Sequence, residues 1–136
     1  IYAGTESGIF VSTNAGRSWH DQPFPRESAP VLSLALMPDG RLLAGTEAAG
    51  MLLTDAAGAA WRQVSGNGTV NALHAGSGRM LALLDDALIA STDAETWTAL
   101  QSLPAGKLAL TMLPHPAAPD RALVGFADGE IRLLKW

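Results

Sequence analysis

The amino-acid sequence predicts an all-β fold in which one four-stranded antiparallel sheet is repeated along the chain. Trp19, Trp61 and Trp97 recur along the 136 residues at a regular spacing, with a period of about 40 residues. Between them, short apolar runs alternate with turn formers such as Pro38-Asp39-Gly40. Strands of about four to seven residues fit these runs, and no interval holds a helix of about 10 to 12 residues.

The repeat itself sets the expected architecture. The run IYAGT at residues 1–5 returns as LLAGT at 42–46, and degenerate copies begin at Met80 and Ala122. A period of about 40 residues is the length of a propeller blade. We therefore expect a β-propeller segment of about 3.5 four-stranded antiparallel blades, forming a single domain over 1–136 with blades at approximately 1–29, 30–69, 70–107 and 108–136.

Each strand of the unit has its own signature. The first strands are apolar at both odd and even positions, as expected for strands that line the axis with a sheet against each face; they are Val31–Leu36, Val70–Ala75 and Leu108–Leu113. The second strands start at Ile1, Leu42, Met80 and Ala122, third strands include Gly8–Ser12 and Ala87–Ser91, and the fourth strands surround the three tryptophans. With three first strands and four second strands, the chain opens inside one blade and stops inside another. We expect a piece of a larger propeller, or closure with another copy or polypeptide.

A turn motif precedes each of these tryptophans. Ser12-Thr-Asn14-Ala-Gly16-Arg-Ser18-Trp19 matches the pattern S-x-D/N-x-G-x-S/T-W. An Asn or Asp side chain accepts backbone N–H groups in a tight turn, glycine supplies a positive φ, and the tryptophan is expected to close the gap between sheets. The drifted copies keep Thr54, Asp55, Gly58 and Trp61 in one case and Ser91, Asp93 and Trp97 in the other.

On these residues the sequence resembles the Asp-box, or BNR-repeat, family. The resemblance implies a propeller of six to eight blades or a larger tandem array. The family includes sialidases, other glycosidases, sortilin-type receptors and a photosystem II assembly factor. The stretch GTESGIFVSTNAGRSW at 4–19 looks most like the last of these and like bacterial propellers of unassigned function. The resemblance also implies that the motif is a structural turn remote from the axis, and it favours an exported, periplasmic or extracellular location.

Few residues offer catalytic chemistry. A sialidase would need a tyrosine nucleophile, yet the only tyrosine, Tyr2, occupies the repeat position of Leu43 and Leu81. Asp85-Asp86 could pair for glycoside hydrolysis or bind a hard cation, but neighbours on a strand point in opposite directions, which favours a hairpin turn. We therefore expect no catalytic residues and no enzyme activity.

Arg41, Arg79 and Arg121 recur where second strands begin. A ring of guanidinium groups on one propeller face could hold an anion, although their recurrence with the repeat favours solvated hairpin mouths. His74 is the one histidine expected to face the axis, and a lone histidine there is more often a packing or hydrogen-bonding residue than a ligand. We expect no metal site and no cofactor.

The amino-acid composition limits the classes of partner that we expect. The net charge is −4 and the nine Lys and Arg are scattered, which argues against nucleic acid. No apolar run approaches the roughly 18 residues of a membrane span, and the absence of cysteine excludes disulfides. We expect a non-catalytic scaffold for protein–protein interaction or complex assembly, with protein partners, further blades or a second copy bound. The alternatives are part of a glycan-active enzyme whose catalytic residues lie outside this chain, or a carbohydrate-binding propeller.

Overall fold

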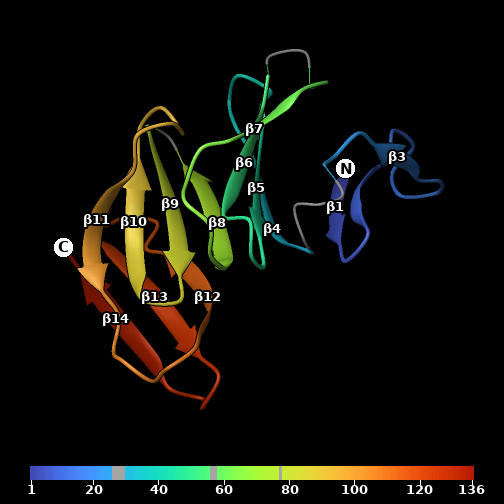
Figure 1. The fold of residues 1–136 in the computed structure, drawn as a ribbon. Coiled ribbons are helices and arrows are strands. Elements are labelled where there is room, and N and C mark those ends of the chain that lie inside the picture. The colour runs from blue at the N-terminus through green and yellow to red at the C-terminus, as the bar shows by residue number, and fades with distance from the viewer. Residues whose placement is uncertain (26–29, 56–57, 77) are drawn as a thin grey trace.

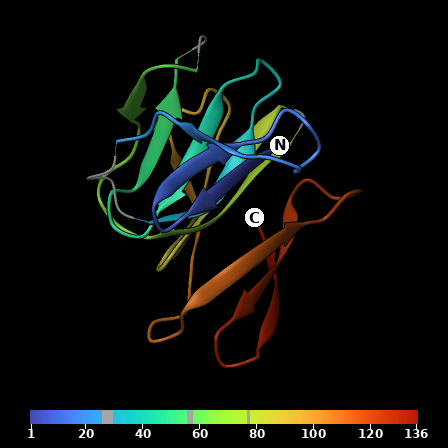
Figure 2. The same cartoon turned by 90° about the vertical axis from the view of Figure 1, so that its right-hand side faces the viewer.

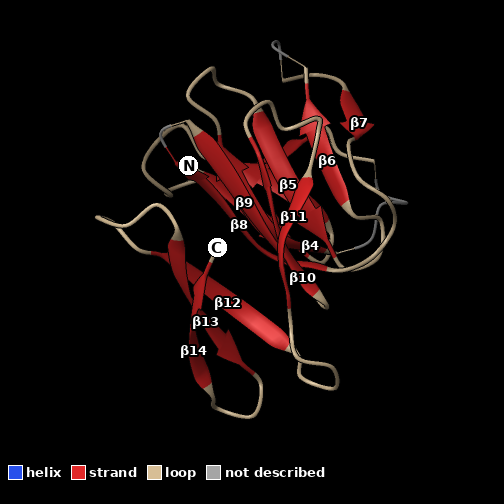
Figure 3. Ribbon diagram, turned by 90° about the vertical axis from the view of Figure 1, so that its left-hand side faces the viewer, coloured by secondary structure: helices blue, strands red, loops and turns tan. Residues whose placement is uncertain are grey.

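The computed structural model describes residues 1–25, 30–55, 58–76 and 78–136, and these residues form strands and loops without a helix (Figure 3). In the same ranges there is accordingly no helix long and apolar enough to cross a membrane. The described strands are β1 (Tyr2–Thr5), β2 (Gly8–Val11), β3 (His20–Gln22), β4 (Val31–Leu36), β5 (Leu42–Thr46), β6 (Met51–Thr54), β7 (Trp61–Gln63), β8 (Val70–Gly76), β9 (Arg79–Leu84), β10 (Ala87–Ser91), β11 (Thr98–Ser102), β12 (Ala109–Pro114), β13 (Arg121–Phe126) and β14 (Ile131–Lys135).

The strands pair into four antiparallel meanders, one for each copy of the repeat. Blade 1 is β1-β2-β3, blade 2 is β4-β5-β6-β7, blade 3 is β8-β9-β10-β11 and blade 4 is β12-β13-β14. The blades follow one another as an open arc from β1–β3 to β12–β14 (Figure 1), and contacts between β1 and β4, β4 and β8, and β8 and β12 join successive blades. The predicted all-β propeller segment of about 3.5 blades is confirmed.

In blades 1 and 2 a glycine of the second strand receives the first strand of the next blade. A Cβ added at Gly4 would lie 2.6 Å from Val31 Cγ1, and one added at Gly45 would lie 2.7 Å from Val70 Cγ1. The strand registers place Leu83 and Ala109 at the corresponding positions of blades 3 and 4, and both are fully buried in one cluster. A large residue in one strand is thus matched by a small one in its neighbour, as close packing requires.

Three apolar clusters form the core, one at each junction between blades. The junction of blades 2 and 3 buries Leu43, Met51 and Leu53 together with Met80. The junction of blades 3 and 4 buries Leu83, Leu88, Val124 and Phe126, among others. The junction of blades 1 and 2 is smaller and centres on Ile9, Val31 and Ala44. Most stabilisation from apolar burial therefore lies around blade 3.

The two ends of the arc correct one expectation about the inner strands. Leu36 and Leu113 are 57% and 65% exposed, although both belong to first strands predicted to be covered on both faces. Leu36 follows Ala35, which is buried toward blade 3, so by alternation it faces blade 1, where no strand lies inside β1. Leu113 is in register with the exposed Leu123 and Leu133 on the face of blade 4 that has no neighbour.

Candidate functional site

The turn before Trp19 is the first motif turn, and it is held by side-chain hydrogen bonds. Ser12 Oγ donates to Asn14 Oδ1 and accepts the backbone N–H of Gly16 at 2.8 Å. Asn14 Oδ1 accepts the N–H of Ser18, and Asn14 Nδ2 donates to the Ser18 hydroxyl. Ala15 and Gly16 both have positive φ, at 61° and 85°. Each polar position of the motif therefore satisfies backbone or side-chain groups of the turn itself.

The third turn reaches the same result with one residue fewer. Asp93 Oδ1 accepts the backbone N–H groups of Glu95 and Thr96 and the hydroxyl of Ser91. These bonds, first those from the Thr96 and Glu95 amides, hold the pKa of Asp93 well below its ordinary value. Only Ala94 has positive φ here. Because the shortened turn has one left-handed position instead of two, it has no need of the glycine.

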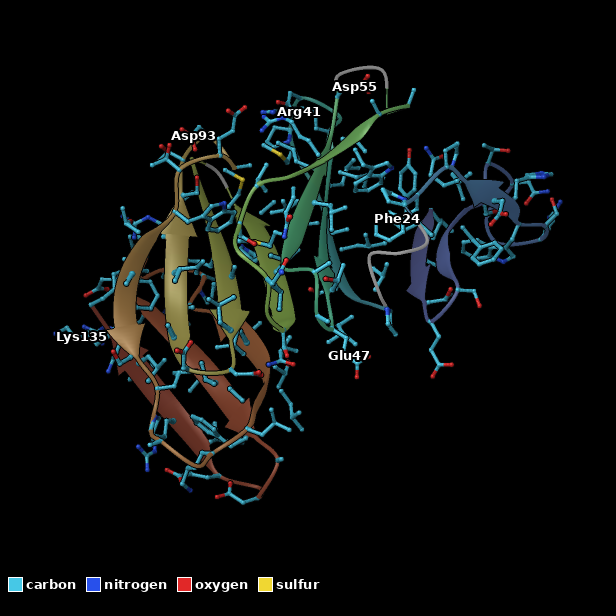
Figure 4. The ribbon with its side chains drawn as sticks, in the orientation of Figure 1. Phe24, Arg41, Glu47, Asp55, Asp93 and Lys135 are labelled. Atoms are coloured by element: carbon cyan, nitrogen blue, oxygen red, sulfur yellow. The ribbon has the colours of Figure 1, made fainter. Side chains whose placement is uncertain are left out.

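The second turn is described at its two ends, since Ala56 and Ala57 lie outside the described residues. Asp55 Oδ1 accepts the N–H of Ala59 at 2.9 Å, and Gly58 has a φ of 71°. The buried Thr54 hydroxyl accepts the N–H of Leu42 and ties the turn to β5. An acid one position early in the sequence can therefore still close the turn. Asp55 and Asp93 lie at the same end of the blades as Arg41, opposite Glu47 (Figure 4).

The motif tryptophans differ in environment, and here a prediction fails. Trp61 meets Phe24 of blade 1 edge to face, with ring centroids 4.9 Å apart, and its Nε1 donates to Pro23 O. Trp97 packs on the cluster between blades 2 and 3. Trp19 is 41% exposed and does not close a gap between sheets. Trp61 and Trp97 each pack toward the preceding blade, and none of the described strands lies on that side of blade 1 (Figure 2).

The preceding blade also holds each later turn by polar contacts. Gln22 Nε2 donates to Gly58 O at 2.9 Å. Arg62 of blade 2 donates to Glu95 Oε1 in the third turn, and Arg41 Nη1 lies 3.9 Å from the same carboxylate oxygen. The motif turns thus take part in blade-to-blade contacts rather than in a pocket around the axis.

The three recurring arginines do not form a uniform ring. Arg41 Nε donates to Asp39 at 2.8 Å, and this contact together with the Arg41 amide lowers the pKa of Asp39. Arg121 Nε lies 3.5 Å from Asp120 Oδ1. The Arg79 side chain is exposed and makes no hydrogen bond or ion pair among the described residues. Arg41 and Arg79 share one cavity of about 250 Å³, which Arg121 does not line.

His74, expected to face the axis, lies exposed near the end of β8, beside the turn that leads to Arg79. It lines a cavity between blades 3 and 4 with Arg79 and His115. Among the described residues no three His, Asp or Glu side chains come together as metal ligands. Asp85 accepts a hydrogen bond from Asn71 at the exposed β9–β10 turn, and Tyr2 lies two blades away.

A groove of about 690 Å³ lies between blades 2 and 3. Its apolar part consists of half-buried or buried side chains: Val64, Val70, Leu84, Ile89 and Trp97. Its polar part comes from the connection between β7 and β8 and from three carboxylates, Asp85, Asp86 and Glu95. The cavity volume lies within the range of about 300–1,000 Å³ typical of ligand sites.

Charge is unevenly distributed along this groove. Glu95 is paired with Arg62 at one end. At the other end, Asp85 bonds only a neutral amide, and Asp86 is exposed, with no ion pair to its carboxylate in the described part of the chain. This end therefore has a net negative charge beside the apolar side chains of Leu84 and Ile89, while Trp97 follows Glu95 at the other end. Such a combination suits a cationic side chain with an apolar stem.

Sequence reasoning missed this groove although it discussed Asp85, Asp86 and Trp97, which line it. Asp85 and Asp86 were assigned to a hairpin turn and Trp97 to the core, and the structure places them along one cavity. The signal that could have found it is the polar, glycine-rich connection 65–69, which leaves space beside β10. Nothing in the sequence shows which side of that connection faces a neighbouring blade.

Comparison with known proteins supports the fold. No family model and no curated protein matches the sequence. Three solved structures match 98–99% of this chain. The Swd1 β-propeller domain of Myceliophthora thermophila has a TM-score of 0.69 at 16% identity. The extracellular domain of a putative one-component system from B. thetaiotaomicron has 0.72 at 20% identity. YCF48, solved bound to D1 peptide, has 0.64 at 15% identity.

The chain is a stretch of β-propeller. It spans 47% of the Swd1 domain, 46% of the YCF48 chain and 20% of the extracellular domain. It therefore corresponds to less than half of each of these propeller-containing chains.

Proposed function

We propose that this chain is a non-catalytic propeller scaffold that binds a segment of a protein partner. The groove between blades 2 and 3 is the observation that carries the proposal, because it combines an apolar floor, the Trp97 ring and an acidic end. Loops on a rigid β scaffold are frequent binding surfaces. The YCF48 structure with D1 peptide supports a peptide ligand for this fold.

The chemistry of the groove specifies a class of ligand. An apolar peptide segment would cover Val64, Ile89 and Trp97, and a Lys or Arg at one end would meet Asp85 and Asp86. Opposite charges across an interface raise the rate of association and fix the orientation of the ligand. The proposed ligand is therefore an extended peptide with apolar residues next to a basic one.

A second proposed interaction is with a further propeller blade, which would pack on the exposed face of blade 4. Gly125 occupies the position that receives a valine in blades 1 and 2, yet a Cβ there would meet only Thr111 Cγ2 within 4 Å. It is surrounded by the exposed Leu123, Ile131 and Leu133. We infer that a further blade covers this face with a branched aliphatic residue over Gly125. The three Asp-box-like turns are consistent with membership of the BNR-repeat family and with export, both of which are part of this proposal.

Peptide display tests the ligand class. Peptides selected from a random library on the parent protein should contain Lys or Arg beside apolar residues, and fluorescence anisotropy should show their affinity falling at least about tenfold in Asp86→Lys. Glu6→Lys is the matched control, because it makes the same charge change on an exposed turn of blade 1. Selected peptides that bind both variants equally would contradict the proposal. Oligosaccharide binding lost in Asp86→Lys would favour the carbohydrate-binding alternative instead.

A further inference from the structure

A second, smaller cavity lies between blades 3 and 4, at the end of the blades where β8 turns into β9. Blade 3 contributes His74, Gly76, Arg79 and Leu81, and blade 4 contributes a proline-rich turn at 114–119. The cavity measures about 290 Å³, which is at the lower end of ligand sites. It has room for one terminal or side-chain group of a partner and a small neighbouring group.

Arg79 is the one formally charged side chain among the described ones that line this cavity. Asp39 and Asp93 line adjacent cavities that Arg79 also lines, but among the described residues no ion pair joins it to either of them. In blades 2 and 4 the arginine at the start of the second strand faces an aspartate, Asp39 for Arg41 and Asp120 for Arg121. Arg79 has no such partner among the described residues, and none of the side chains that line the cavity is acidic. In a protein with a net charge of −4, this is a local exception, and a guanidinium presents paired N–H donors that match a carboxylate.

The geometry also leaves space for a ligand beside the imidazole groups. A Cβ added at Gly76 would lie 3.1 Å from His74 Nε2, so the glycine gives the ring its room. On the opposite wall, His115 Nδ1 accepts the N–H of Ala117 at 3.2 Å, which fixes its ring orientation. The remaining walls are Leu81 and three prolines, which are rigid and apolar.

From this arrangement we propose that the cavity binds a carboxylate of a peptide, with Arg79 as its main donor and His74 and His115 beside it, and with a small apolar group of the peptide against Leu81 and the prolines. The carboxylate comes either from the chain terminus or from an Asp or Glu side chain. This inference shares with the proposed function only the class of partner. It does not depend on the groove between blades 2 and 3.

Labelled short peptides ending in Pro-Leu provide the test, by fluorescence anisotropy on the parent protein. The probe with a free C-terminal carboxylate should bind saturably below about 1 mM, and its C-terminal amide should bind at least about tenfold more weakly. A probe that ends in Glu with an amidated C-terminus shows whether a side-chain carboxylate can be bound in place of the terminal one. Arg79→Gln should weaken binding at least about tenfold, whereas Arg17→Gln, which removes an exposed arginine of blade 1, should leave it unchanged.

A second variant tests the shape of the cavity without changing its charge. Gly76→Ala should weaken the same probe several-fold, because the methyl group displaces the His74 ring. Asp86→Lys should not change this affinity, which separates the two sites. The proposal is overturned if acid and amide probes bind equally, if no probe binds below about 1 mM, if Arg79→Gln binds like the parent, or if inorganic phosphate displaces the probe at lower concentration than acetate.

Discussion

Trp61 and Trp19 occupy the same position of the repeat and have different environments. Trp61 lies against Phe24 and donates to Pro23 O of the preceding blade, while Trp19 is 41% exposed. The same contrast holds for Gly45, which is filled by Val70, and Gly125, which has no aliphatic neighbour from a following blade. One motif is therefore packed or exposed according to whether another blade lies beside it. The contribution of the motif to stability therefore depends on the contact between blades and not on the motif itself.

The largest difference in unfolding free energy is expected between the Trp61→Ala and Trp19→Ala variants. Trp61→Ala should lower the free energy of unfolding by about 3 kcal/mol, because it leaves a cavity against Phe24 and removes a hydrogen bond. Trp19→Ala should cost about 0.5 kcal/mol or less, as is usual for a surface side chain. Urea denaturation of the two variants and the parent measures both values. Equal losses would show that the motif stabilises its own turn and not the junction between blades.

A smaller difference in stability is expected between the Gly45→Ala and Gly125→Ala variants. Gly45→Ala places a methyl group 2.4 Å from Ser33 Oγ and 2.7 Å from Val70 Cγ1, and such overpacking should cost about 2 kcal/mol. Gly125→Ala meets only the end of the Thr111 side chain, at 2.9 Å, and should change stability by no more than about 0.5 kcal/mol. Thermal unfolding measures the difference. A Gly125→Ala loss as large as that of Gly45→Ala would mean that the face of blade 4 is already packed.

The motif turns are expected to differ in how their stability responds to acid. The pKa of Asp93 is lowered in the folded state, so its stabilising effect is present above the unfolded value of about 3.9 and is lost as the pH falls below it. Asn14 fills the same role in the first turn without a titratable group. The stability difference between the parent and Asp93→Asn should therefore shrink from pH 6 to pH 3, measured by denaturant unfolding at each pH. If the difference stays constant over this pH range, the negative charge of Asp93 does not stabilise the turn.

Substitutions on the open face of blade 4 should hardly change the free energy of unfolding, but they should change self-association. Leu123 and Leu133 are 42% and 55% exposed, and the neighbouring Leu134 is 5% exposed. Replacing Leu123 and Leu133 by Ser should leave unfolding almost unaltered and reduce hydrophobic-dye binding and self-association, seen by light scattering. Leu134→Ser is the matched control on the opposite face and should destabilise by about 2–4 kcal/mol. A parent that is monomeric and binds no dye would contradict an open interface.

No turnover is expected from any of these surfaces. The parent should not hydrolyse aryl sialosides or other aryl glycosides above background, since Tyr2 lies in blade 1 and Asp85 in blade 3. Steady-state assays with Tyr2→Phe and Asp85→Asn as controls test this. Hydrolysis by the parent that disappears in either variant would establish a catalytic site and contradict the scaffold proposal.

Much of the fold could be predicted because its determinants are local. A hydroxyl, an Asx side chain and a left-handed residue within five positions close a turn by themselves, as at Ser12–Gly16. Apolar runs between such turns predict the strands. The groove could not be predicted, because Asp86, Ile89 and Trp97 come together with Val64 only when blade 3 packs on blade 2.

The amino-acid sequence alone determined the all-β class, the repeat and the turns, since these depend on side chains close together in the chain. Only the tertiary structure decided which members of the repeat are covered. Trp19, Gly125 and Arg79 match their counterparts in sequence, but burial and ion pairing depend on neighbours supplied by another blade or turn. Where no described neighbour covers it, or the neighbouring turn lacks an acid, an ordinary repeat position is exposed or unpaired.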